Sequence, residues 1–222
     1  MTGEVWISSV MNDHSLSTRS GARAKYYGKD WPPPTFDLRE GPDVDMQAYR
    51  RYWRGETLAR EELTEALFVF DKGRWAKRKD LFTAGSFYAV KGRLAEVLAA
   101  FDLGEGGLIE FPVYEEDKRT LVEGGPYYLL KFGCIKNTFV PEKSIGLRSR
   151  RTIEQDGYEL WADYMNLKDG DIAVTRDALD GPDLWFEKKL QDRIFMSGRL
   201  HDAILAAKVN VDFRFSKARL LD

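Results

Sequence analysis

The chain has 222 residues, against a usual domain size of about 100–200, which fits one domain with an elaborated flank. Its 34 Lys and Arg residues nearly balance its 36 Asp and Glu residues, so the net charge is −2, and 43% of residues are hydrophobic. This composition excludes a disordered chain. Because nucleic-acid binders carry a basic excess, we expect a globular protein with no nucleic-acid partner.

The sequence carries no feature of export or membrane insertion. Residues 1–11 lack both a basic start and a long apolar stretch, so they are not typical of a signal peptide. Apolar runs such as Leu67–Phe70 are far shorter than the roughly 20 residues that span a bilayer. Cys134 is the one cysteine, which excludes an intramolecular disulfide and fits a reducing compartment. We therefore expect a cytoplasmic protein without a membrane partner.

The N-terminal part is polar and irregular in composition. A strand is predicted at 4–10, and the three prolines Pro32–Pro34 exclude both a helix and a central strand at their position. Apolar residues at helical spacing predict a helix over 44–54 with Asp43 as its N-cap. A second helix is predicted over 57–65, where Glu, Leu and Ala are frequent.

From residue 81 onward, strand and helix patterns alternate. Apolar runs predict strands at 87–90, 108–114, 127–132, 158–161, 172–174, 184–186, 194–196 and 211–215, and amphipathic spacing predicts helices at 93–101 and 199–208. The second and third of these strands are expected to form an antiparallel hairpin. The predicted class is α+β with a mixed or antiparallel sheet, in which an arm over 1–80, with one or two helices, packs on a body over 81–222 as one compact unit.

Two segments share a pattern. Residues 87–98 and 193–204 each contain an apolar strand, one polar residue, Gly-Arg-Leu, and then an amphipathic helix with an early acid. Their glycines, Gly92 and Gly198, allow a sharp turn off a strand. Convergence on a common strand-to-helix turn and internal duplication both remain open. Either one predicts two strand-helix-strand units with helices on one face of the sheet.

The residues that could support catalysis are few. His14 and His201 are the two histidines, so with one cysteine a zinc site is disfavoured. Ser197 and His201 lie four residues apart, but Ser197 occupies the N-cap position of a predicted helix, and capping is its expected role. The basic runs 74–79 and 148–151 are interpreted as solvated faces, because acidic residues flank both. We expect no catalytic residue, metal or cofactor.

A family resemblance supplies a function. The segments 167–174, 181–186 and 193–204, followed by the closing strand 211–215, resemble the C-terminal half of immunity-protein family eleven, a bacterial family associated with polymorphic toxin systems. The similarity extends from about residue 80 to the end of the chain. It implies an α+β protein, not an enzyme, that binds and neutralises a cognate toxin, with the toxin encoded by an adjacent gene. The family has no catalytic residues to carry over.

The resemblance implies occlusion of the toxin's active site by a rigid surface with aromatic anchors. Candidate partner-binding residues are the aromatics of the Pro-rich segment, Tyr26, Tyr27, Trp31 and Phe36. The alternative is that these side chains pin the arm to the body.

A rival hypothesis is a Mg²⁺-dependent enzyme with a carboxylate cleft. Asp169, Asp171 and Asp183 are the carboxylates that such a site would use. Convergence of the three in one pocket would favour the enzyme, whereas positions in separate turns would argue against it.

Overall fold

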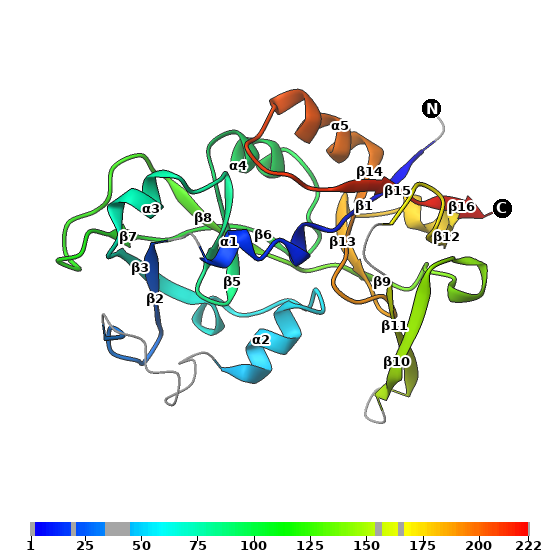
Figure 1. The fold of residues 1–222 in the computed structure, drawn as a ribbon, viewed down its shortest axis with the longest axis horizontal. Helices are drawn as coiled ribbons and strands as arrows, with labels where there is room; N and C mark the ends of the chain where they lie inside the picture. The colour runs from blue at the N-terminus through cyan, green and yellow to red at the C-terminus, as the bar shows by residue number, and fades with distance from the viewer. Residues whose placement is uncertain (1–2, 19–20, 34–44, 154–156, 164–166, 222) are drawn as a thin grey trace.

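The computed structural model describes residues 3–18, 21–33, 45–153, 157–163 and 167–221, and it shows an α+β fold (Figure 1). Its two largest sheets have five and four strands, and smaller sheets flank them. The predicted α+β class with mixed and antiparallel sheets is confirmed.

The five-stranded sheet joins the two ends of the chain. Its order is β15-β1-β14-β13-β9, with bounds Phe215–Lys217, Val5–Ser8, Ile194–Ser197, Leu184–Glu187 and Ile135–Lys136. Strand β1 pairs antiparallel with both β14 and β15, so the N-terminal strand lies inside a sheet made of C-terminal strands. Strand β9 pairs parallel with β13 at the other edge.

The four-stranded sheet is antiparallel and comes from the middle of the chain. Its order is β4-β5-β8-β6, with bounds Leu81–Ala84, Phe87–Lys91, Tyr127–Lys131 and Gly107–Glu110. The predicted hairpin is confirmed for its first part, because β6 pairs with β8. The predicted single strand over 108–114 is wrong beyond Glu110. Pro112 has no N–H to donate, and Val113–Tyr114 (β7) instead pairs parallel with β3 in another sheet.

The two large sheets contain the same unit. Hairpin β4–β5 leads into α4 (Gly92–Ala99) and then β6, with β8 inserted antiparallel between β5 and β6. Hairpin β13–β14 leads into α5 (Gly198–Ala207) and then β15, with β1 inserted antiparallel between β14 and β15. Helices α4 and α5 contact each other. The predicted strand-helix-strand units are therefore present, and their matching topology favours the duplication interpretation.

The remaining elements surround this pair of units. The sheets β2-β3-β7, β10-β11 and β12-β16 contain β2 (Ala22–Tyr26), β3 (Thr64–Val69), β10 (Leu147–Ile153), β11 (Tyr158–Asp163), β12 (Ala173–Thr175) and β16 (Arg219–Leu221). The other α-helices are α1 (Ser15–Thr18), α2 (Met46–Tyr52) and α3 (Lys72–Ala76). Short 3-10 turns are η1 (Val10–Asn12), η2 (Arg60–Glu62), η3 (Pro141–Lys143) and η4 (Arg176–Leu179).

Three predicted boundaries need correction. The helix predicted over 57–65 is wrong: η2 gives way to β3, where Thr64 begins the pairing with β2, so strand pairing overrides helix propensity. Helix α2 begins at Met46 and is capped by Asp45, whose carboxylate accepts from the Gln47 N–H, whereas the predicted cap Asp43 lies outside the described residues. The strand predicted over 211–215 begins only at Phe215 (β15), because Arg214 has a left-handed φ of 50°, and β16 follows it.

The core follows the paired units. A main cluster includes Leu94 of α4, Leu200 and Ile204 of α5 and Val90 of β5, so both helices pack into one interior. A second cluster packs Ile7, Trp185 and Phe195 on the other side of the five-stranded sheet. Helix α2 lies away from the α4–α5 pair in Figure 1, below β5. This placement leaves α2 free to form one side of a cleft.

Candidate functional site

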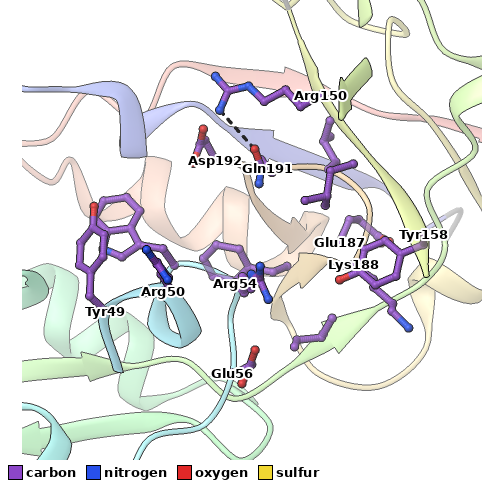
Figure 2. Close-up of a pocket in the computed structure, with 15 residues that line it drawn as sticks. Tyr49, Arg50, Arg54, Glu56, Arg150, Tyr158, Glu187, Lys188, Gln191 and Asp192 are labelled. Carbon is purple, nitrogen blue, oxygen red and sulfur yellow. Dashed lines mark hydrogen bonds between the residues drawn. The ribbon is translucent and has the colours of Figure 1, made fainter. Parts of the chain in front are cut away.

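A cleft of about 840 Å³ lies between α2 and the protruding β10–β11 hairpin (Figure 2). Four parts of the chain form it: α2 with the following turn, β9, the β10–β11 hairpin, and β13 with the loop after it. We call it the α2 cleft. Its lining residues are Tyr49, Arg50, Trp53, Arg54, Glu56, Ile135, Arg150, Tyr158, Leu160, Phe186, Glu187, Lys188, Leu190, Gln191 and Asp192.

The α2 side of the cleft is fixed to the body from beneath. Tyr52 is fully buried, and its hydroxyl donates to the Leu130 carbonyl at 2.7 Å and accepts from the Tyr88 N–H at 3.0 Å. Burial raises the pKa of Tyr52 well above its usual value, so the hydroxyl stays a neutral bridge. The Trp53 indole donates to the Ser86 carbonyl at 3.2 Å. These bonds hold the exposed face of α2 in one orientation.

The end of α2 packs directly on the floor of the cleft. Gly55 has a φ of +82°, and a Cβ at this position would lie 2.6 Å from the ring of Phe186. Only glycine fits both this conformation and this approach. The contact fixes the distance between the helix and β13, which supplies the floor.

The β10–β11 side of the cleft is fixed by two backbone hydrogen bonds and a buried ion pair. The Trp161 N–H donates to the Lys189 carbonyl at 2.8 Å, and the Gln191 N–H donates to the Trp161 carbonyl at 3.0 Å. Arg193 binds Asp163 of β11 through Nη2 and Nε at 2.5 to 2.9 Å, and both side chains are buried. Both sides of the cleft are therefore pre-organised.

Cations outnumber accessible carboxylates in the cleft. Arg50, Arg150 and Lys188 have no carboxylate within ion-pair distance in the described part of the chain. Glu56 is bound by Arg51 at 3.2 Å. Glu187 is buried and accepts from four neutral donors, which occupy both of its oxygens: the Thr138 N–H and hydroxyl, the Phe139 N–H and the Trp185 indole.

The apolar part of the cleft lies between these charges. Ile135 is 43% exposed, and the rings of Tyr49 and Trp53 pack on each other with centroids 5.7 Å apart. Arg150 extends from the hairpin and donates to the Gln191 amide at 3.2 Å, as Figure 2 shows. Arg, Tyr and Trp are the residue types that dominate binding energy at protein interfaces. The geometry suits recognition of an anionic, partly apolar ligand.

Sequence reasoning missed this cleft. Tyr49 and Trp53 belong to the helix predicted over 44–54, and neither was among the candidate binding residues. Arg150 belongs to a basic run interpreted as a solvated face. Two features of the sequence could have indicated the cleft: the aromatic residues of the helix and the basic residues of the strand. The local sequence does not show, however, that these two segments, about 100 residues apart, face each other.

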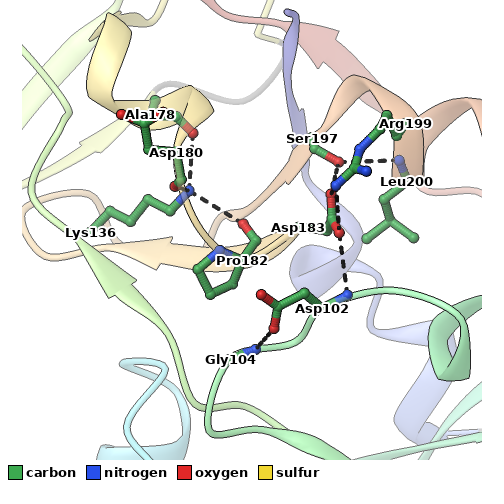
Figure 3. A network of polar contacts seen from close by, with 10 residues as sticks. All are labelled: Asp102, Gly104, Lys136, Ala178, Asp180, Pro182, Asp183, Ser197, Arg199 and Leu200. Atoms are coloured by element: carbon green, nitrogen blue, oxygen red, sulfur yellow. Dashed lines mark hydrogen bonds and ion pairs between the residues drawn. The ribbon is translucent and has the colours of Figure 1, made fainter.

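A second polar cluster joins the two units (Figure 3). Asp183, which is 3% exposed, accepts from the Ser197 hydroxyl at 2.5 Å, from the Asp102 N–H at 3.2 Å and from Arg199 at 2.9 Å. Ser197 also accepts from the Leu200 N–H at 3.2 Å, so its predicted role as N-cap of α5 is confirmed. Asp183 thus links β13, β14 and the loop after α4.

Asp80 occupies the corresponding place in the other unit. It precedes β4 as Asp183 precedes β13, its carbonyl accepts from the Lys91 N–H at 3.0 Å, and its carboxylate accepts from the Lys91 ammonium at 3.3 Å. The same carboxylate accepts from the N–H of Asn210, in the loop after α5, at 3.1 Å. Each unit therefore uses one aspartate to bind the loop that follows the helix of the other unit.

The two repeat glycines serve different purposes. Gly92 has a φ of +54°, as the predicted sharp turn requires. Gly198 does not have a positive φ, and a Cβ there would lie 3.2 Å from the Cβ of Glu4. Its small size therefore allows the close approach of β1.

Lys136 and Cys134 lie near this cluster, and neither side chain is activated as a nucleophile or a base. The Lys136 ammonium donates to the carbonyls of Ala178, Asp180 and Pro182 at 3.0, 2.7 and 3.3 Å, as Figure 3 shows, and lies 3.6 Å from the ring centroid of Trp185. Burial lowers the pKa of Lys136, but three acceptors use all three of its N–H bonds. Burial also raises the pKa of the Cys134 thiol, which disfavours the reactive thiolate.

The candidate partner-binding aromatics take different positions. The Tyr26 hydroxyl accepts from the Ser86 N–H at 3.1 Å, and its ring packs on Phe87. Trp31 packs edge-on against Phe68, with centroids 5.4 Å apart. These contacts attach the segment to β3 and β5, whereas Tyr27 is 38% exposed and stacks with Arg60. Phe36 lies outside the described residues, and partner binding by the set stays a prediction.

The candidate catalytic residues do not assemble. Asp169 accepts from the Lys217 N–H at 2.8 Å, Asp171 accepts from the Lys168 N–H at 2.9 Å, and Asp183 lies in the cluster above. Within the described ranges, no group of three His, Cys, Asp or Glu side chains is arranged to hold a metal ion. His201 is buried against Trp6 at a centroid distance of 3.8 Å, and its Nδ1 lies 2.9 Å from Asp202.

No protein-family model matches the chain, and a search of curated proteins finds no match either. Membership of the immunity family therefore stays a prediction from the segments quoted above. Among the helices in the described part of the chain, none has the length and apolar character needed to cross a bilayer.

Proposed function

We propose that this chain is a bacterial immunity protein that binds a cognate toxin and neutralises it by occluding the toxin's active site. The observation that carries the proposal is the α2 cleft, a pre-organised surface with Arg, Tyr and Trp side chains. The motif resemblance over the body of the chain agrees with it. In this proposal the adjacent gene encodes the toxin, and the two proteins meet in the cytoplasm.

Pre-organisation supports a binding role on energetic grounds. Ordering flexible side chains on binding costs about 0.5–1.5 kcal/mol for each one, so a surface fixed beforehand retains more of its contact energy. Here the Tyr52 bridge fixes α2 and the Asp163–Arg193 pair fixes the hairpin. A rigid surface of this kind blocks a catalytic cleft without chemistry of its own.

Co-expression in a bacterial host tests the proposal. The product of the adjacent gene is expressed alone, with this chain, or with the Phe195→Asp variant, in which a charge replaces a fully buried ring. The proposal expects growth arrest by the neighbour alone, rescue by the wild-type chain, and no rescue by the core variant. A neighbour that does not arrest growth, or arrest that the wild-type chain leaves unchanged, would overturn it.

A further inference from the structure

We propose that the α2 cleft receives an acidic segment of the partner protein, whose carboxylates bind the cationic rim while one apolar side chain contacts Ile135. The inference rests on the proposed function and names the surface and the chemistry that recognise the toxin. It moves the main binding surface from the Pro-rich segment to the cleft.

Charge complementarity selects an acidic occupant. Three lining cations, Arg50, Arg150 and Lys188, have no carboxylate within ion-pair distance among the described residues, whereas two of the three lining carboxylates, Glu56 and Glu187, are already engaged by protein donors. Asp192 is the remaining carboxylate. The rim cations Arg50 and Arg150 come from opposite sides of the cleft, so an extended acidic segment between them contacts both. Because the whole chain has a net charge of −2, the positive charge is confined to this patch, and a local patch favours a specific partner.

The floor of the cleft explains why the occupant carries an apolar side chain as well. Ile135 is exposed at the edge strand β9, and the buried residues Leu160 and Leu190 also line the cleft. A fully solvated polyanion would leave this surface wet. A peptide segment with an aliphatic or aromatic side chain among its acids removes it from water.

The aromatic residues do not form a platform for nucleic-acid bases. The Trp53 ring contacts Tyr49, Tyr52 and Tyr88 with centroids 5.4 to 6.4 Å apart, and its N–H is used by the Ser86 carbonyl. The Lys188 ammonium lies over the ring of Tyr158 at 4.7 Å. Single-stranded nucleic acids are held by open ring faces on which bases stack, whereas the rings of Trp53 and Tyr158 already contact protein side chains. The arrangement therefore favours a protein segment.

A matched pair of charge-reversal variants tests the inference. The cleft variant is R50E/R150E/K188E, and the control is R93E/R119E/K77E, whose residues are exposed and lie outside the cleft. Each replaces two Arg and one Lys, so both variants have the same net charge. The affinity of each purified full-length chain for the purified product of the adjacent gene is measured by calorimetry at low and high salt. Circular dichroism verifies that each variant is folded.

The expected result is a loss of at least about 100-fold in affinity for the cleft variant and less than about 3-fold for the control, with a weaker salt dependence in the cleft variant. If the cleft variant is unfolded, the single substitution R50E replaces it, because Arg50 is exposed and has no ion-pair partner among the described residues; a loss of at least about 5-fold is then expected.

Three results would overturn the inference, and they are distinguishable. Equal affinities of the two triple variants would refute the cleft while leaving the proposed function intact. Absence of binding by the wild-type chain would refute both. Binding of a twelve-residue thymidine oligonucleotide by the wild-type chain, lost in the cleft variant, would assign the surface to nucleic acid instead.

Discussion

The substitution Asp163→Ala tests how the hairpin side of the cleft is held. Asp163 and Arg193 have side-chain exposures of 4% and 2%. The carboxylate oxygens accept from Arg193 Nη2 at 2.5 and 2.7 Å and from Nε at 2.9 Å. Alanine removes these acceptors from Nη2 and Nε, whereas Nη1 still donates to the Asp192 carbonyl.

The magnitude follows from the charge that remains. A buried guanidinium without its counter-ion destabilises a fold by about 3–5 kcal/mol, a large part of the roughly 5–15 kcal/mol by which domains are stable. Replacing both partners by apolar side chains avoids this penalty. We therefore expect Asp163→Ala to lower the free energy of unfolding by about 3–5 kcal/mol, and D163L/R193M to lie within about 1 kcal/mol of the wild type.

Urea unfolding followed by circular dichroism measures both effects. The half-exposed pair Lys25–Glu65 supplies the control, because Glu65→Ala is expected to change the free energy of unfolding by less than about 1 kcal/mol. A loss below about 1 kcal/mol for Asp163→Ala, or a double variant as unstable as the single one, would refute the reasoning.

Two further predictions concern polar contacts away from the hairpin. Lys136→Met leaves three carbonyls without their ammonium donor, so we expect a loss of about 1–3 kcal/mol in the free energy of unfolding, against less than about 0.5 kcal/mol for the exposed control Lys77→Met; equal losses would contradict this account. The Thr120 hydroxyl and the N–H groups of Thr120 and Arg119 lower the pKa of Asp117 to about 2. Because this native pKa lies below the unfolded one, its stabilising effect is present above about pH 4 and disappears as the pH falls toward 2. Thr120→Val removes one donor, so an NMR titration of Asp117 is expected to show a pKa raised toward its usual value, and an unchanged pKa would refute the assignment.

The sequence predicts local elements well where one segment determines them. The Gly-Arg-Leu pattern marks the start of α4 and of α5, and the apolar runs locate β5, β13 and β14. Prediction from the sequence fails where pairing with a strand distant in the chain determines the secondary structure. The helix predicted over 57–65 instead ends in a strand because β2 pairs with it, and the break at Pro112 sends β7 to another sheet.

The cleft illustrates the same limit. Trp53 and Arg150 each stand in a segment whose composition was noticed, yet their proximity depends on how α2 and the hairpin attach to the floor. That attachment rests on a tyrosine bridge, an approach at Gly55 and a buried ion pair, all between distant parts of the chain. The match between Asp80 and Asp183 is likewise hidden in the sequence, because Asp80 lies 12 residues before Gly92 whereas Asp183 lies 15 residues before Gly198.

Hydrogen exchange of the free chain and of its complex with the adjacent gene product tests the central claim most directly. The cleft account predicts that binding slows amide exchange in α2 and β11, the elements that form the two sides of the cleft. Slowed exchange confined to residues 22–33, with no change in α2 or β11, would contradict the account and assign binding to the Pro-rich segment.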